Sequence, residues 1–429
     1  MSRNTQIMAL LFFTVFEINA VFLNAVELKT QNAKYSGVSI STGGISIEDC
    51  IIQNNSSLAG NGGGICGIDT STVSTAKITI SRCQILENSV LLSPNGGGGA
   101  YLSILHKPVS IDGCSFVGNT ASTASPVSVS FKGGGGLLVD TAIYSGPIKN
   151  CIFRDNYLNA DIDGAAAYFS TAVTLQNCLF TNNSTESVNF QCSVLNLKKK
   201  SAVYNSTFAQ NSTLGAKSGR VINLNNLASS VINCLFVGNV SNNTGNIANT
   251  NNSIIKNCAT DGDAFLGTTA SLSNNLTTIT ATNTFEIPST FSGAPISLVH
   301  KEASAVANWN LKSTSPAINK GLDLSASPTL IITDIVGNTR PQGGVFDIGA
   351  YEFQTQTSVD RISASVRFRT TKSGIEFFGL NIADVVTVFD VTGNVVTTKT
   401  ANDSNLFINL SNGIYLIRVG NITTKVIIP

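Results

Sequence analysis

The residues of this chain that could do chemistry are acidic side chains placed close together. They form two groups. The first contains Asp155, Asp161 and Asp163, and the second contains Asp261 and Asp263. A pair of carboxylates can act as acid and base on a glycosidic bond. A carboxylate cluster can also hold Ca²⁺ beside a Lys or Arg base, here Lys132 or Arg154, as a polysaccharide lyase requires. Because a glycine directly follows Asp163 and Asp261, ordinary turn chemistry explains both groups without catalysis.

The nine cysteines are the next candidates. Six of them occupy one position of a repeat: Cys50, Cys83, Cys114, Cys151, Cys178 and Cys234. An odd total argues against a closed disulfide framework. The lack of any CxxC pair, with only His106 and His300 as histidines, argues against zinc. The sequence therefore predicts buried free thiols and no metal site.

Each of these cysteines belongs to a motif that recurs along the chain, for which Ile111–Asn119, IDGCSFVGN, is the type. Successive copies lie 24 to 37 residues apart, with Ser206 in the cysteine position of one copy and Cys258 in a decayed last copy. A period of this size indicates a solenoid. The same motif predicts an inward ladder of Phe116, Phe153, Phe180, Phe208 and Phe236. It also predicts a ladder of asparagines at a turn, formed by Asn88, Asn119, Asn156, Asn183, Asn211 and Asn239.

A glycine-rich stretch precedes the cysteine strand in the central coils, as in GGGGAY at Gly96–Tyr101. Apolar residues alternate in both halves of the repeat, which favours short strands separated by turns. Three short strands and three turns would make one coil of a parallel β-helix, whose inward side chains are buried only when coils stack. The stacking predicts an all-β fold.

Composition narrows the class of partner. Only 12% of residues are charged and the formal net charge is +1, so nucleic acid and anionic membrane are not expected as ligands. Lys198-Lys199-Lys200 is a basic run that could contact an anionic polymer. No internal apolar stretch reaches 18 residues, so no transmembrane span is predicted. Residues 1–25 resemble a signal peptide with cleavage after Ala20 or Ala25, and the alternative is an amphipathic cap on the first coil.

The end of the repeat region carries more specific motifs. They are SPAINKG at Ser315–Gly321, DxxGxxRP at Asp334–Pro341 and DIGAYE at Asp347–Glu352. Together they resemble the closing segment, called a choice-of-anchor Q region, of bacterial surface proteins with a right-handed parallel β-helix. The resemblance implies such a helix over residues 26–353.

A polar linker at 354–361 leads to a different pattern at 362–429, where short alternating strands favour a small antiparallel Ig-like β-sandwich. The stretches VTVFDVTGNVV, LSNGIYLIRVGN and TKVIIP resemble a type IX secretion sorting domain of subtype A. The family features fall on Gly413, Tyr415 and Lys425. The resemblance implies secretion or display on the outer-membrane surface, reached through the periplasm, with the sorting machinery as a partner.

Three functions remain open at this level. The first is a structural or adhesin-like rod that contacts a surface glycan or protein. The second is a polysaccharide lyase or glycoside hydrolase on the same scaffold, for which Ca²⁺ is the cofactor to expect. The third is a tethered binding module for nutrient capture, which would retain a glycan without turnover. Three or more carboxylates converging with a Lys or Arg in one groove would favour the enzyme.

Overall fold

The computed structural model describes residues 17–18, 22–24, 27–28, 37–40, 45–58, 60–69, 77–91, 95–122, 132–144, 146–159, 163–185, 191–213, 218–225, 228–241, 247–248, 252–262, 271–289, 307–326, 329–354, 367–371, 373–419 and 422–428. The chain divides into two compact units, Met1–Thr355 and Gln356–Pro429. None of the described helices is long and apolar enough to cross a membrane.

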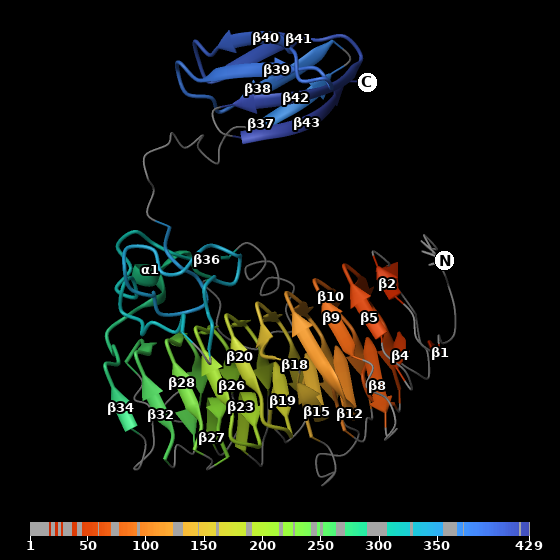
Figure 1. The fold of residues 1–429 in the computed structure, drawn as a ribbon, viewed down its shortest axis with the longest axis vertical. Coiled ribbons are helices and arrows are strands. Elements are labelled where there is room, and N and C mark those ends of the chain that lie inside the picture. The colour runs from red at the N-terminus through yellow and green to blue at the C-terminus, as the bar shows by residue number, and fades with distance from the viewer. Residues whose placement is uncertain are drawn as a thin grey trace. The chain divides into compact units, whose positions relative to one another are not determined.

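Unit 1 is a parallel β-helix, which confirms the predicted fold class. Its coils stack along one axis in Figure 1, from the red strands near the N-terminus to the green ones. The strands that carry the cysteine motif form a nine-stranded parallel sheet: β3 (Glu27–Leu28), β6 (Ile51–Gln53), β10 (Gln84–Leu86), β13 (Ser115–Val117), β17 (Ile152–Arg154), β21 (Leu179–Thr181), β25 (Thr207–Ala209), β29 (Leu235–Val237) and β33 (Ala259–Thr260).

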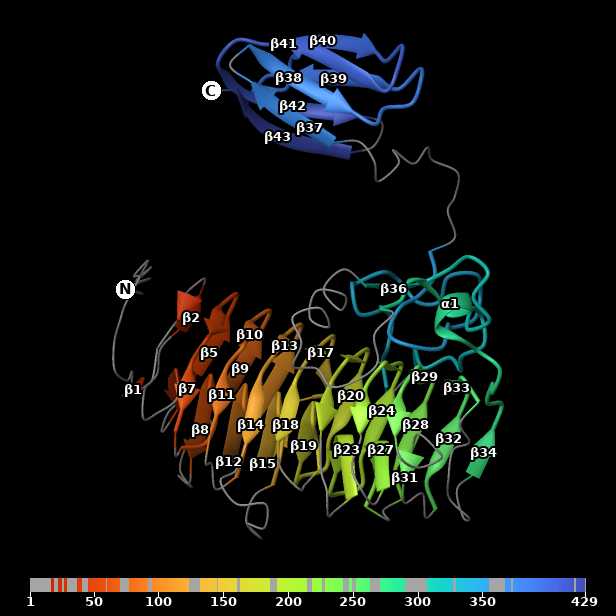
Figure 2. The ribbon, with the colours of Figure 1, turned by 180° about the vertical axis from the view of Figure 1, so that it is seen from behind.

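A second parallel sheet follows the ladder asparagines, and Figure 2 shows its central strands in one row. Its strands are β7 (Ser56–Ser57), β11 (Ser89–Val90), β14 (Thr120–Ser122), β18 (Tyr157–Asn159), β22 (Ser184–Thr185), β26 (Ser212–Thr213) and β30 (Val240–Ser241). The prediction of three strands per coil is therefore wrong, because a short Ser- and Thr-rich strand lies after each asparagine and gives the coils four.

The other two stacks form one 18-stranded sheet, because β12 (Ala100–Asp112) is long enough to belong to both. Glycine-rich stretches lead into three strands of the first stack, β8 (Ile65–Asp69), β12 and β15 (Leu137–Tyr144). The other strands of that stack are β1 (Glu17–Ile18), β4 (Val38–Ile40), β19 (Ala167–Phe169), β23 (Gln191–Leu197), β27 (Ser218–Asn223) and β31 (Ile247–Ala248). The strands before the cysteines are β2 (Phe22–Asn24), β5 (Ile45–Glu48), β9 (Ile78–Ser81), β16 (Ile148–Lys149), β20 (Thr174–Gln176), β24 (Ala202–Tyr204), β28 (Ser230–Ile232), β32 (Ile254–Lys256) and β34 (Ser271–Ser273).

The N-terminal coil bears on the predicted signal peptide. Residues 1–16 lie outside the described residues. β1 and β2 fall within the predicted 1–25 segment and pair in parallel with β4 and β5. This pairing is the arrangement that a cap on the first coil would have, and cleavage stays a prediction.

Like residues stack inside the helix. The rings of Phe116, Phe153, Phe180, Phe208 and Phe236 follow one another with centroids 4.6 to 5.0 Å apart and planes within 3 to 5°. This spacing is the rung repeat of a parallel sheet. The six repeat cysteines are buried beside them, as small apolar side chains would be.

The ladder asparagines do not adopt the left-handed conformation expected of them. Positive φ falls instead on the residue just before each one, as at Glu87, Asp155, Asn182 and Gln210. The asparagine uses its amide group to join coils: Asn183 Nδ2 donates to Asn211 Oδ1 at 3.0 Å and to Phe153 O at 2.8 Å. The residue before each asparagine thus makes the sharp turn, and the asparagine makes the hydrogen bonds between coils. Its side chain points inward, where it reaches the equivalent asparagines of the neighbouring coils.

The glycine-rich stretches permit close approach of the backbone. A Cβ at Gly98 would lie 2.4 Å from the carbonyl oxygens of Gly135 and Thr120, so a larger residue there would collide with fixed backbone.

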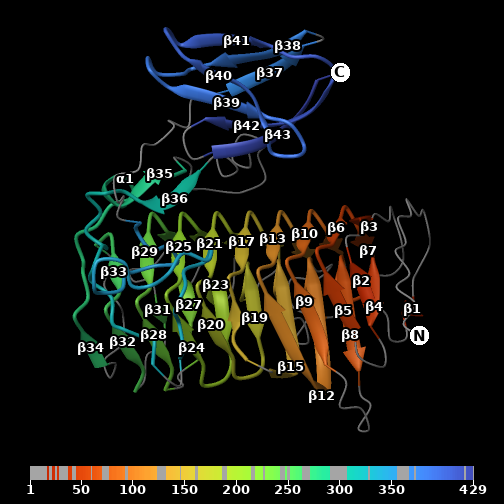
Figure 3. The ribbon, with the colours of Figure 1, turned by 45° about the horizontal axis from the view of Figure 1, so that its top comes forward.

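A closing segment, residues 274–354 within the described ranges, follows β34, the last strand of the coil stack. It contains α1 (Ala281–Thr284), β35 (Phe285–Ile287) and β36 (Asn308–Leu311), and Figure 3 shows its later part beside the yellow and green coils. Trp309 packs edge-on against Phe285 with centroids 5.0 Å apart. Both belong to a cluster with Leu179, Leu235 and other outward residues of the helix. The segment therefore covers a lateral face of the β-helix.

Unit 2 is an antiparallel sandwich of two sheets. One contains β37 (Arg367–Thr371), β38 (Gly374–Phe378) and β41 (Asn405–Asn409). The other contains β40 (Val395–Thr400), β39 (Val385–Phe389), β42 (Gly413–Val419) and β43 (Ile422–Ile428). Buried Ile375, Val388 and Ile417 lie in one core between them.

Candidate functional site

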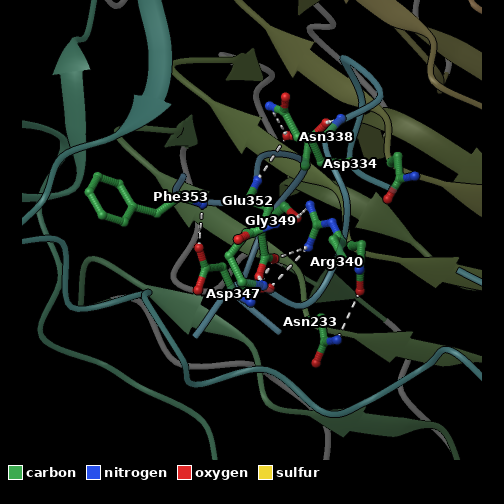
Figure 4. Close-up of polar contacts among 12 residues, drawn as sticks. Asn233, Asp334, Asn338, Arg340, Asp347, Gly349, Glu352 and Phe353 are labelled. Atoms are coloured by element: carbon green, nitrogen blue, oxygen red, sulfur yellow. Dashed lines mark hydrogen bonds and ion pairs between the residues drawn. The ribbon is translucent and has the colours of Figure 1, made fainter. Parts of the chain in front are cut away.

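Three carboxylates and one arginine converge in the closing segment. Figure 4 shows the Arg340 guanidinium directed at Asp347, Gly349 and Glu352. Its Nη1 lies 3.4 Å from Glu352 Oε2, and both side chains are 0% exposed. It also donates to the carbonyl oxygens of Asp347 at 3.3 Å and Gly349 at 2.8 Å. Arg340 therefore joins the two ends of the loop formed by residues 340–352.

The carboxylates of this cluster accept hydrogen bonds from backbone N–H groups. Asp334 accepts from Val336, Asn338 and Glu352. Asp347 accepts from Asn319 and Phe353. Glu352 accepts from Gln342 and Asp347. Buried carboxylates that satisfy backbone donors hold a loop in shape and offer no face to a substrate, so this cluster is structural.

Its electrostatics follow from burial. Removal from water raises the pKa of Glu352 to about 7, although Arg340 opposes the rise. Burial also raises the pKa of Asp347 above its usual value and lowers the pKa of Arg340. One guanidinium cannot compensate three buried carboxylates, so the carboxyl group of Glu352 takes up a proton more readily than it would in water.

The same segment is bonded to the coils beneath it. Asn233 donates from Nδ2 to Leu322 O at 2.8 Å and accepts from Leu322 N at Oδ1 at 2.7 Å. Gly349 N donates to Asn233 O at 2.8 Å, and Ala350 N donates to Thr207 Oγ1 at 2.9 Å. A Cβ at Gly349, whose φ is +109°, would lie 2.8 Å from Thr207 Oγ1. Glycine at this position lets the DIGAYE motif approach the helix.

A groove lies between this segment and the sheet that contains β16, β20 and β24. Its volume is about 960 Å³. The described residues that line it are Gly146, Pro147, Lys149, Asn150, Ala172, Val173, Thr174, Gln176, Asn177, Lys200, Ser201, Ala202, Tyr204, Ser230 and Thr329–Thr333. This set includes two lysines and no aspartate or glutamate.

Residues 329–333, named the strap, form one wall of the groove. Gln176 Nε2 donates to Thr329 O at 3.1 Å, and Asn177 Nδ2 donates to Thr333 O at 2.9 Å. Between these two bonds, Leu330 has a φ of +50° and is 65% exposed, and Ile332 is 60% exposed. A leucine held in the left-handed region is strained, and here it places an aliphatic side chain on the rim of the groove.

The predicted aspartates that the structure describes, Asp155, Asp163 and Asp261, do not come together in an open site. Asp155 is buried in the turn between β17 and β18, with Arg154 Nε 3.4 Å from its Oδ2. Asp261 is exposed and accepts from Gly238 N. Asp161 and Asp263 lie outside the described residues. In the described part of the chain no group of three or more His, Cys, Asp or Glu residues could hold a metal ion.

Asp163 lies in a buried polar network on another face. It is 8% exposed, accepts from Asn223 Nδ2 at 3.2 Å, and lies near Ser193, Asn196 and Lys198. Burial raises its pKa to about 6. Its neighbours are two amides, a hydroxyl and the ammonium group of Lys198, all from later coils, which suits a role in coil stacking.

The other residues singled out from the sequence lie in different parts of the structure. Lys132 pairs with Asp140 at 2.5 Å, whereas His106 lies in β12 and His300 is outside the described residues. In unit 2, Tyr415 donates its hydroxyl to Ser411 O at 3.0 Å, and a Cβ at Gly413 would touch its ring at 3.4 Å. Lys425 pairs with Leu416 across β43 and β42.

Two groups of residues are not predicted from the sequence. One is the Arg340 cluster, whose charges stand out in a chain with few charged residues and could have been noticed within DxxGxxRP and DIGAYE. The other is the groove, whose strap and floor are more than 150 residues apart in the sequence. No family model matches the chain, and the comparison with curated proteins finds no match.

Proposed function

We propose that this chain is an exported β-helix protein with a structural, adhesin-like role, in which the β-helix unit binds a ligand at a surface without cleaving it. The observation that carries the proposal is the distribution of charge. The carboxylates that converge with an arginine are buried and bonded to backbone, whereas the open groove is lined by lysines and neutral side chains. Hydrolysis of a glycoside would need carboxylates in the groove.

The export part of the proposal depends on the C-terminal unit. Its motifs resemble a type IX sorting domain of subtype A, and those of residues 315–352 resemble a choice-of-anchor Q region. We therefore propose a route through the periplasm, followed by release or display on the outer membrane. The C-terminal sandwich would be the part that the sorting machinery recognises.

Deletion of Ile362–Pro429 in a Gram-negative host with such a route tests the export proposal. We expect the deleted protein to accumulate in the periplasm with its β-helix folded, measured by fractionation and protease resistance. The full chain is the control. Normal surface display or release of the deleted protein would refute the sorting role.

A glycan array combined with a polysaccharide-cleavage screen tests the binding role. The proposal predicts retention of one or more glycans with no release of shorter products. Cleavage of any bound polysaccharide would establish the alternative, a lyase or hydrolase. Retention of nothing on the array, together with no adhesion of the purified protein to cell surfaces, would remove the adhesin role.

A further inference from the structure

We infer that the groove between the strap and the β16–β20–β24 sheet is a binding site for an acidic oligosaccharide, one that carries carboxylate or sulfate groups. This inference rests on the proposed binding function and names its site and the chemistry of its ligand. It is carried by three features of the described residues: the charge of the lining, the chemistry of the floor and the exposed apolar rim.

The charge of the lining selects for an anion. Lys149 and Lys200 are the charged side chains among the described lining residues. Lys149 Nζ lies 3.4 Å from Asp112 Oδ2, and its side chain remains 45% exposed. Lys200 is exposed at the turn before β24. The ammonium group of lysine is a point charge on a flexible stem, which can pair with anionic groups in several orientations.

The two lysines are placed for an extended ligand. Lys149 ends β16, and β16, β20 and β24 are successive rungs of one parallel stack. Lys200 precedes the third of these strands, so the lysines lie two rungs, or about 10 Å, apart along the helix axis. They also lie toward opposite ends of these strands, because Lys149 is the last residue of β16 and Lys200 lies two residues before β24. A single small anion could not bridge them, whereas a chain of sugars with repeated acidic groups could.

The floor between the lysines suits sugar hydroxyls. Thr174, Ser230 and Tyr204 contribute hydroxyl groups. These side chains both donate and accept hydrogen bonds, as the hydroxyl groups of a sugar do. On the rim, Leu330 and Ile332 expose aliphatic surface that the C–H face of a sugar ring could cover.

Two other polyanions fit less well. An acidic peptide commonly binds by adding a strand to a sheet edge, but the floor is a sheet face whose backbone groups already bond to the coils on either side. A single-stranded nucleic acid needs several aromatic platforms, and Tyr204 is the one aromatic residue among the described lining residues. The floor therefore recognises its ligand through side chains, which favours a glycan.

The test is a calorimetric titration of the full chain with size-matched probes: an oligogalacturonate, a sulfated oligosaccharide, a neutral oligosaccharide and an oligoglutamate peptide. We expect an acidic oligosaccharide to bind and the neutral one and the peptide to bind at least roughly tenfold more weakly. Binding should weaken as salt is raised, because exposed charge pairs are screened.

Matched variants locate the site. Lys200→Gln combined with Lys149→Gln should weaken binding of the acidic oligosaccharide by roughly tenfold, as two partly exposed ion pairs would. Lys199→Gln removes the same charge from the neighbouring exposed residue, which does not line the groove, and should bind like the wild type. Ala202→Trp fills the floor with the lysines intact and should abolish binding. Melting curves identify any variant that loses its fold, and Lys200→Gln alone then replaces the double variant.

Each outcome decides between the possibilities. Equal losses for Lys199→Gln and the groove variants would mean non-specific attraction and overturn the site. Tighter binding of the peptide would overturn the glycan assignment. No binding of either acidic oligosaccharide would overturn the inference, while glycan retention on the array would leave the proposed function standing. Cleavage of a probe that the groove variants no longer bind would keep the site and refute the non-catalytic role.

Discussion

At the scale of single residues, the inward phenylalanines show how one side chain can stabilise several coils. Phe180 is 0% exposed and stacks on Phe153 at 4.8 Å and on Phe208 at 4.6 Å. Its removal would leave a cavity between two rings that the strands hold at the rung spacing and that cannot collapse together. The loss therefore includes a cavity contribution beyond the loss of buried surface.

Phe180→Ala is expected to lower the free energy of unfolding of unit 1 by about 3–5 kcal/mol. The measurement is denaturant unfolding followed by circular dichroism. Leu58→Ala is the control, because Leu58 lies on the same helix and is 56% exposed. A loss no larger than that of the control would contradict the role of the phenylalanine stack.

Asn183 tests the cross-coil role of the asparagines. Its Nδ2 donates to Phe153 O and Asn211 Oδ1, and its Oδ1 accepts from Asn156. Asn183→Asp replaces the donor by a carboxyl group that can donate only when protonated, so the folded state should raise its pKa above the unfolded value of about 4. The destabilisation should grow as pH rises above about 4. Thermal unfolding from pH 4 to 8 checks this, with Asn183→Ala as the variant whose loss should not vary with pH.

The cysteine ladder predicts the pattern of thiol reactivity. The hydrogen bond with the next thiol of the ladder, together with burial, raises the pKa of Cys83 to about 12 and that of Cys114 well above its usual value. Thiols in this state react slowly. Among the eight cysteines whose burial the structure describes, Cys66 is the one that is partly exposed. Titration with a thiol reagent should find nearly all nine thiols free after denaturation, and Cys66→Ser should remove one equivalent from the fast phase in native protein. Mostly disulfide-bonded cysteines would contradict the ladder.

At the scale of elements, the stability of the closing segment depends on the buried charged side chains of its Arg340 cluster, which is not part of the repeat. Glu352 has a folded-state pKa of about 7, above its ordinary value. A carboxyl group whose pKa is raised on folding binds protons more tightly in the folded state, so its contribution to stability falls as pH rises between the two values. Asp163 and Asp347, whose pKa values are also raised, act in the same direction.

Glu352→Gln should therefore make the stability of the β-helix less dependent on pH. We expect the melting temperature of the wild-type β-helix to fall between about pH 5 and pH 7.5, and the fall to be smaller in the variant, although the variant is less stable throughout because Arg340 loses its ion pair. Scanning calorimetry in matched buffers measures both. A slope unchanged by the substitution would show that Glu352 does not titrate in this range.

The elements also show which parts of the structure the sequence could predict. The phenylalanine and cysteine positions follow from the period, because stacking repeats the same environment in each coil. The conformation of the asparagines was misjudged, since Asn and the residue before it are both common turn residues and only the backbone shows that Asp155 and Asn182 have positive φ. The fourth strand of each coil was missed because Ser184–Thr185 is too short and polar for a strand pattern.

The candidate site could not be predicted in the same way. The Arg340 cluster and the strap occur once, so no repeat indicates their environment. Asn177 reaches Thr333 and Asn233 reaches Leu322 because the closing segment lies along the side of the helix, and hydrogen bonds between such distant parts of a chain leave no local pattern.

At the scale of the whole molecule, the two units have separate cores. The buried cluster of unit 1 contains the ladders of the β-helix, and that of unit 2 contains Ile375, Val388 and Ile417. Units that bury their apolar residues internally can fold independently. The chain cut after Thr355, at the boundary between the units, should then melt at the temperature of one transition of the full chain.

Calorimetry of three proteins tests this independence: the full chain, residues 1–355 and residues 356–429. The sum of the two fragment curves should reproduce the curve of the full chain, because separate cores contribute separate enthalpies of unfolding. Phe180→Ala in the full chain should lower one transition and leave the other unchanged, which assigns the transitions without reference to the fragments. A shift of both transitions, or a fragment that does not melt cooperatively, would show that the units stabilise each other and that removal of the C-terminal unit tests folding as well as export.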